Sequence, residues 1–311
     1  MNTTELLAAI KRNITVPTYQ PRFKPEDLLD LAFEEQKTTI VPMVIGISQN
    51  YFMFTETIAL APDTFEVPFP YRAIANASKN ITYDNGRDDP YQLTSLRLTQ
   101  VINMRPELLG TPASFLVYND RIRLYPRPLL AGVLKFIYYI NPSKPVSLDR
   151  VSNVLAVGVD TLTLVKIPTN IVVGSLVDIT KAKSGYSLTY IDQTVTNISG
   201  NTITLAGFSA LNPISNVSLG DYVSTAEETG ILQLPNEAQD VLVQAVAVRV
   251  LQALNVPDQL KIAQERFTEK REFVQLIMAP RIEDQTDILN NGHPLIGIRN
   301  YGNVPRVNVT P

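Results

Sequence analysis

The chain contains one histidine, His293, within the segment Asn291-Gly292-His293-Pro294. A histidine acts as a base or as a metal ligand when another polar group orients its ring, and no such group lies close to His293 in the sequence. The pattern therefore favours a loop residue without a catalytic role.

Three aspartates, Asp84, Asp88 and Asp89, surround Gly86 and have the composition of a calcium-binding loop. Such a loop ends in a bidentate glutamate, which this segment lacks, so a solvated turn is the expected structure. The chain has no cysteine, which excludes thiolate metal sites and disulfide bonds. We expect no metal ion and no cofactor.

Motifs of the common enzyme classes are absent from the sequence. It contains no Gly-x-Gly-x-x-Gly segment, no phosphate-binding P-loop and no Gly-x-Ser-x-Gly elbow. Carboxylate pairs that hydrolyse glycosides meet only in the folded chain, and nothing in the sequence selects such a pair. We therefore expect a protein that is not an enzyme, with a tail-borne cell-wall hydrolase as the last alternative.

Basic residues are dispersed along the chain, whose formal net charge is −3. The densest group alternates with acidic residues and comprises Lys261, Glu265, Arg266, Glu269, Lys270, Arg271 and Glu272. Alternating charge on a helix indicates a salt-bridged, solvated face rather than a stripe that grips nucleic acid.

Residues 236–278 contain two helical patterns, which are interrupted at Asn255-Val256-Pro257. The first, Ala238 to Leu254, is apolar almost all the way round, so it must be covered by its own domain or by neighbouring copies of the chain. The second, Asp258 to Met278, is amphipathic, with Leu260, Ala263, Phe267, Val274 and Ile277 at helical spacing. The two patterns predict an αα-hairpin.

We expect neighbouring copies to supply part of that cover. The predicted oligomer interface lies on the first helix and comprises Val241, Leu242, Ala245, Val246, Val248, Arg249 and Gln252.

Strand patterns fill the middle of the chain. Runs at Ile40–Ile47 and Val133–Ile140 predict strands, Ser114–Tyr125 predicts a hairpin with a period of two, and residues 92–101 fit either a strand or a short helix. From residue 148 to about residue 228, strand-like runs recur every eight to twelve residues, which predicts a small β-barrel or sandwich.

The expected fold class is α+β. A helical hairpin and N-terminal helices pack with an antiparallel β-domain, into which a small barrel or sandwich is inserted. The predicted domains are an N-terminal helical segment (1–37), the antiparallel β-domain (38–147), the inserted β-module (148–230), the C-terminal hairpin (231–279) and an extended C-terminal arm (280–311).

Several segments occur in an order that resembles the head-to-tail connector proteins of short-tailed bacteriophages. Gly110-Thr111-Pro112-Ala113-Ser114-Phe115 is followed by Leu124-Tyr125-Pro126-Arg127-Pro128, by Tyr138-Tyr139, and later by Leu234-Pro235-Asn236-Glu237 before the apolar helix. The resemblance covers roughly residues 25–140 and 230–278, and the residues that carry it are structural rather than catalytic. Tails built from stacked rings, as in the crAss-like phages of gut bacteria, fit the same resemblance.

The resemblance implies a virion protein at the head-to-tail interface, assembled in the host cytoplasm. Connectors of this family form rings, commonly of twelve copies, beneath the portal protein and against an adjacent tail ring or tail-hub protein. Genomic DNA passes through the ring without sequence-specific binding. The C-terminal arm is expected to dock on a neighbouring subunit or on a different protein.

The main alternative is a tail-associated module that binds a receptor or carbohydrate through Tyr186, Tyr190 and Tyr222. No membrane partner is expected, because the chain has neither a signal-peptide pattern at Met1–Glu5 nor a continuous apolar stretch long enough to span a bilayer.

Overall fold

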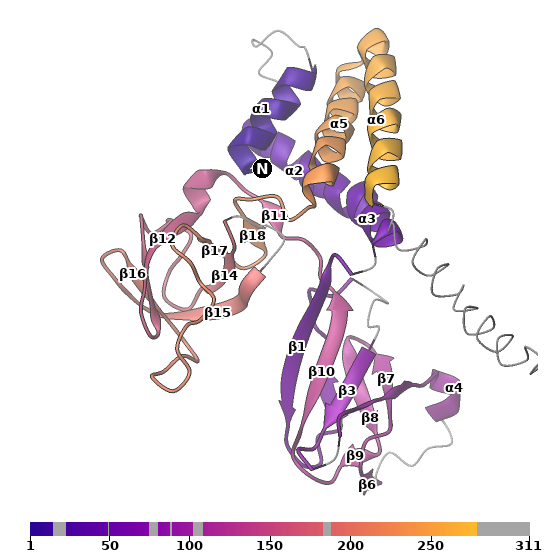
Figure 1. Ribbon diagram of the computed structural model, residues 1–311, viewed down its shortest axis with the longest axis vertical. Coiled ribbons are helices and arrows are strands. Elements are labelled where there is room, and N and C mark those ends of the chain that lie inside the picture. Colours follow the sequence, from indigo (N-terminus) through magenta and orange to yellow (C-terminus); the bar gives the residue numbers. More distant parts are fainter. Residues whose placement is uncertain are drawn as a thin grey trace, which may run out of the picture.

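The computed structural model describes residues 1–14, 23–48, 50–74, 80–87, 89–101, 108–182 and 188–278. It has the predicted α+β class. Figure 1 shows the helices gathered at the top, a barrel at the lower left and a second β-structure at the lower right.

The helix α5 (Asn236–Leu254) lies at the centre of the helical part. It packs against α1 (Thr3–Ile14), α2 (Pro25–Glu35) and α6 (Pro257–Met278) of the same chain. The predicted αα-hairpin is therefore confirmed, and most of the apolar side chains of α5 are buried within the chain. Side chains from all four helices form one hydrophobic core, which includes Leu6, Ile10, Leu28, Ala32, Val241, Leu242, Val246 and Ala263.

The strand predicted at Ile40–Ile47 is wrong, because this segment is helical. A π-helical turn (Gln36–Ile40) continues α2 and leads directly into α3 (Val41–Ile47). Val41 and Val44, three residues apart, bury one helical face in the core of the helical part. Tertiary packing thus overrides the strand preference of the β-branched residues.

Two four-stranded sheets enclose a second hydrophobic core and form a β-sandwich. The first sheet has the order β1 (Met53–Leu60), β10 (Gly132–Tyr139), β3 (Asn80–Asp84) and β4 (Tyr91–Gln92). The second has the order β2 (Glu66–Pro68), β8 (Arg121–Tyr125), β7 (Ser114–Tyr118) and β5 (Thr94–Ser95).

The strongest strand patterns in the sequence lie in this sandwich and are confirmed. β10 corresponds to the predicted strand Val133–Ile140, and β7 and β8 form the predicted hairpin. Residues 92–101 contain both of the expected structures, since β5 is followed by the short helix α4 (Leu98–Val101). A small parallel pair, β6 (Leu109–Gly110) and β9 (Arg127–Pro128), lies at one end of the sandwich.

Six further strands form a closed barrel. The segment predicted as either a small barrel or a sandwich is therefore a barrel. The order of the six strands is β12 (Ser152–Val157), β13 (Thr161–Leu164), β16 (Thr202–Leu205), β15 (Leu188–Ser199), β14 (Leu176–Thr180) and β17 (Tyr222–Thr225), and β17 pairs with β12 to close the ring. β15 is the longest strand of the barrel.

The two ends of the barrel segment lie side by side. β11 (Lys144–Pro145) precedes the barrel, a 3-10 turn (Leu148–Arg150) leads into it, and β18 (Glu228–Thr229) follows it. β11 and β18 pair in parallel, with Lys144 opposite Glu228. The chain therefore leaves the barrel next to the point at which it enters. No helix within the described ranges is long and apolar enough to cross a membrane.

Candidate functional site

The predicted interface on α5 divides into a buried and an accessible part. Val241, Leu242 and Val246 are fully buried, and Ala245 is 4% exposed. The helices α1, α2 and α6 of the same chain cover them. These four residues are therefore not available to a neighbouring copy, and the interface prediction for them is corrected.

The remaining three predicted residues lie on the second half of α5. Val248 is half-buried, whereas Arg249 and Gln252 are exposed. Nε of Arg249 donates a hydrogen bond of 2.5 Å to Oε1 of Glu35 on α2, so part of its charge is compensated within the chain. These three residues form the part of the predicted interface that another molecule can reach.

The helix α6 carries a second apolar surface, which the amphipathic pattern in the sequence does not predict. Ala263 and Val274 are buried against α5, whereas Ile262 and Phe273, one position earlier in each case, are 50% and 61% exposed. One residue corresponds to a rotation of about 100° around a helix, so α6 carries two apolar faces. Leu276 and Ile277 are also exposed, at 76% and 44%. We call Ile262, Phe273, Leu276 and Ile277 the outer face of α6.

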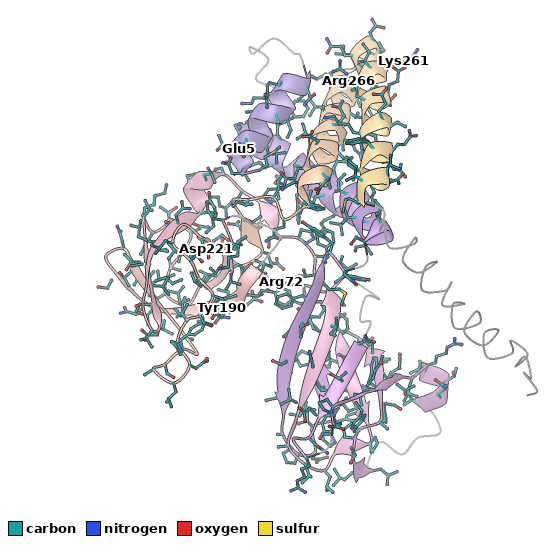
Figure 2. All side chains as sticks on the ribbon, in the orientation of Figure 1. Glu5, Arg72, Tyr190, Asp221, Lys261 and Arg266 are labelled. Carbon is teal, nitrogen blue, oxygen red and sulfur yellow. The ribbon has the colours of Figure 1, made fainter. Side chains whose placement is uncertain are left out.

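A buried ion-pair cluster joins the sandwich to the barrel. The Arg72 guanidinium donates to Oδ2 of Asp178 at 2.6 Å through Nη1, and through Nη2 to Oδ1 of Asp178 at 3.1 Å and Oδ1 of Asp192 at 2.6 Å. Arg72 is 5% exposed and Asp178 is fully buried. Tyr71 donates its hydroxyl hydrogen to Asp192 at 2.8 Å. Figure 2 shows Arg72 between the two β-structures.

Asp178 is held by more than Arg72. The backbone N–H groups of Asp192 and Glu227 also donate to its carboxylate, each at 3.0 Å. Burial raises the pKa of the Asp178 carboxyl above its ordinary value, while the hydrogen bonds and charge of Arg72 act in the opposite direction. The fully bonded carboxylate fixes the barrel against the sandwich and has no free oxygen with which to act on a substrate.

A hollow of about 450 Å³ lies beside this cluster. Among its charged lining residues, Lys144 pairs with Asp30 at 2.6 Å and Glu228 pairs with Arg150 at 2.5 Å, whereas the Glu227 side chain is exposed. Lys37 lies 5.2 Å from the centre of the Phe33 ring.

The acidic segment forms a turn. Oδ1 of Asp84 accepts a hydrogen bond of 2.7 Å from the backbone N–H of Gly86, as a solvated turn requires. Asp88 and His293 lie outside the described residues. Within the described ranges, no group of three or more His, Cys, Asp or Glu residues is placed to hold a metal ion.

Two of the three tyrosines named for the receptor-binding alternative, Tyr190 and Tyr222, lie on different strands of the barrel. Tyr190 donates its hydroxyl hydrogen to the carbonyl oxygen of Ser215 at 2.8 Å, and its ring packs edge-on against Phe208. Tyr222 lies on another strand and lines a separate hollow near the first residues of α5. Tyr186 and the arm 280–311 lie outside the described residues.

Comparison with models of known protein families gave no match for this chain, and comparison with curated protein sequences gave none either.

Proposed function

We propose that this chain is a structural subunit of a bacteriophage virion and forms a ring that joins the portal protein to the tail. The observation that carries the proposal is the order of the connector-like segments in the sequence. The Gly110–Phe115 segment leads into β7, the Leu124–Pro128 segment ends β8, and Tyr138-Tyr139 ends β10. Three of the connector-like segments thus belong to one sandwich.

Two accessible surfaces support an assembly role. The first is the strip of α5 formed by Val248, Arg249 and Gln252. The second surrounds the β6–β9 pair at the far end of the sandwich, where four large apolar side chains are exposed: Leu108, Leu109, Leu129 and Leu130. Groups of exposed apolar residues mark contact sites, and a closed ring requires two different surfaces on each copy.

The charge of the chain suits a channel through which DNA slides. A net charge of −3 gives no general attraction for phosphates, and binding to phosphates supplies most non-specific affinity for DNA. The proposed ring thus encloses the genome during ejection without retaining it.

The purified full-length chain, alone and mixed with its portal protein, tests this proposal. Mass photometry is expected to find closed rings whose mass is a whole-number multiple of the chain mass, and negative-stain images are expected to show a central channel. A chain that stays monomeric with and without the portal protein would overturn the proposal.

A matched pair of variants tests the leucine-rich end of the sandwich. Leu129→Glu is expected to lower ring formation at least about tenfold, because the contact loses apolar burial and gains a charge that must be desolvated. Leu211→Glu is the control, since Leu211 is 98% exposed in a barrel loop. Equal ring formation by the two variants would exclude this end of the sandwich from the interface.

A further inference from the structure

The loop between β3 and β4 contains an asparagine that is followed directly by a glycine, Asn85-Gly86. A backbone nitrogen can attack the side-chain carbonyl carbon of the asparagine before it, because the two groups are already close and the product is a five-membered ring. A side chain on the second residue obstructs this attack, and glycine has none. Gly86 is exposed and has a φ of +69°, a conformation that favours glycine.

The attacking atom, the backbone nitrogen of Gly86, already has a proton acceptor. Its N–H donates a hydrogen bond of 2.7 Å to Oδ1 of Asp84. The nitrogen becomes a strong nucleophile only when it loses this hydrogen. A carboxylate oxygen at hydrogen-bond distance is placed to receive the hydrogen as a general base.

The group under attack, the side-chain carbonyl of Asn85, is polarised by a second hydrogen bond. Its Oδ1 accepts a hydrogen bond of 2.9 Å from the backbone N–H of Arg87. Negative charge develops on this oxygen when the carbonyl carbon is attacked, and a donor aimed at the oxygen stabilises that charge as an oxyanion hole does. One loop therefore provides a base for the nucleophile and a donor for the carbonyl oxygen.

We propose that Asn85 undergoes self-catalysed deamidation, with Asp84 as the base and the N–H of Arg87 as the donor. A bond forms between the Gly86 nitrogen and Cγ of Asn85, and the bond between Cγ and Nδ2 breaks. The hydrogen that leaves the Gly86 nitrogen passes through Asp84 to Nδ2, which departs as ammonia. Water then opens the cyclic imide. Cleavage between Cγ and the nitrogen leaves an aspartate at position 85, and cleavage at the main-chain carbonyl leaves an isoaspartate.

The reaction adds a negative charge to a loop that already carries Asp84, Arg87 and Asp89. This loop adjoins the leucine-rich end of the sandwich, because the hydroxyl group of Tyr83 donates to the carbonyl oxygen of Leu130 at 3.4 Å. The new charge thus lies beside a surface to which the proposed function assigns assembly. That consequence rests on the proposed function, whereas the modification itself does not.

Mass spectrometry of the purified full-length chain tests the proposal. The chain is incubated at neutral pH, and trypsin, which cleaves after Lys79 and Arg87, releases residue 85 on a short peptide. The second Asn-Gly pair, Asn291-Gly292, is on another peptide and lies outside the described residues. The measured quantity is the rate at which the amide of residue 85 is replaced by a carboxylate.

The reference is the same chain unfolded in urea, which keeps the sequence and loses both hydrogen bonds. We expect residue 85 to react at least about threefold faster in the folded chain; a general base contributes roughly 10²–10⁴-fold in enclosed enzyme sites, and this loop is exposed. An equal or lower rate in the folded chain would overturn the proposal.

A matched pair of variants separates the base from the general effect of a nearby charge. Asp84→Asn keeps an oxygen that accepts the Gly86 N–H but cannot take up its proton, and it is expected to lower the rate at residue 85 at least about threefold. Asp89→Asn removes an exposed carboxylate from the same loop and is expected to leave the rate within about twofold, because exposed charges are screened by salt. Circular dichroism checks that both variants are folded. Equal rates for the two variants would exclude Asp84 as the base.

Discussion

At the scale of single residues, Arg72 makes the contacts on which the placement of the barrel depends. Its guanidinium lies between two carboxylates of the barrel, and one of these, Asp178, is fully buried. A buried ion pair adds little net stability compared with apolar residues, but removing one partner leaves an uncompensated charge. The cluster therefore fixes one orientation rather than adding a large stabilisation.

Arg72→Ala is expected to lower the free energy of unfolding by about 3–5 kcal/mol, because it leaves the Asp178 carboxylate buried without a counter-charge. Urea unfolding followed by circular dichroism measures this change. Arg121→Ala is the matched control: Arg121 also pairs with a carboxylate, that of Glu66, but it is 63% exposed. Its loss is expected to cost about 0–1 kcal/mol. Similar costs for the two variants would contradict the structural role of the buried cluster.

This cluster could not be predicted from the sequence. Arg72 and Asp178 are 106 residues apart and belong to different β-structures, so no local pattern connects them. The outer face of α6 is a different case, because Ile262, Phe273, Leu276 and Ile277 occur at helical spacing. The amphipathic pattern also groups Ile277 with Ala263 and Val274, but Ile277 is 44% exposed whereas the other two are buried.

At the scale of elements, the sequence predicted which segments bury apolar surface. It did not predict which parts of the molecule cover that surface. The Ala238–Leu254 pattern required cover on every side, and the chain itself provides it through α1, α2 and α6. Sequence periodicity reports burial and carries no information about whether the cover comes from the same molecule. The Ile40–Ile47 segment shows a related limit, because a short run of β-branched residues fits a buried helix as well as a strand.

Ala247→Asp in α5 tests this intramolecular cover. Ala247 is fully buried, so an unpaired carboxylate at this position is expected to cost several kcal/mol and to prevent folding of the isolated chain rather than only its assembly. Gln252→Asp is the control on the exposed side of the same helix and is expected to fold. Circular dichroism and size-exclusion chromatography distinguish the two variants. A folded, monomeric Ala247→Asp protein would contradict the observed packing of α5.

At the scale of the whole molecule, the barrel is connected covalently to the rest of the chain at one place. β11 and β18 pair in parallel, so the chain enters and leaves the barrel at neighbouring positions, about 5 Å apart. The contacts between described residues of the barrel and the sandwich include the Arg72 cluster and the apolar side chains of Leu188 and Ile191, which pack against the sandwich core. Among the residues that the structure describes, no fully buried residue of the barrel belongs to the helical core or to the sandwich core.

Replacement of residues 146–227 by a short Gly–Ser linker is therefore expected to leave the helices and the sandwich folded. Arg72 loses its partners in this variant, but it also loses the barrel that buries it, so its charge becomes solvated and no unpaired buried charge remains. Circular dichroism should retain the helical signal, and urea unfolding should stay cooperative. Deletion of residues 114–125 is the control and should abolish folding, because Phe115, Ile122 and Leu124 lie in the sandwich core. Aggregation of the barrel deletion to the same extent as this control would show that the barrel stabilises the rest of the chain through more than the contacts at its base.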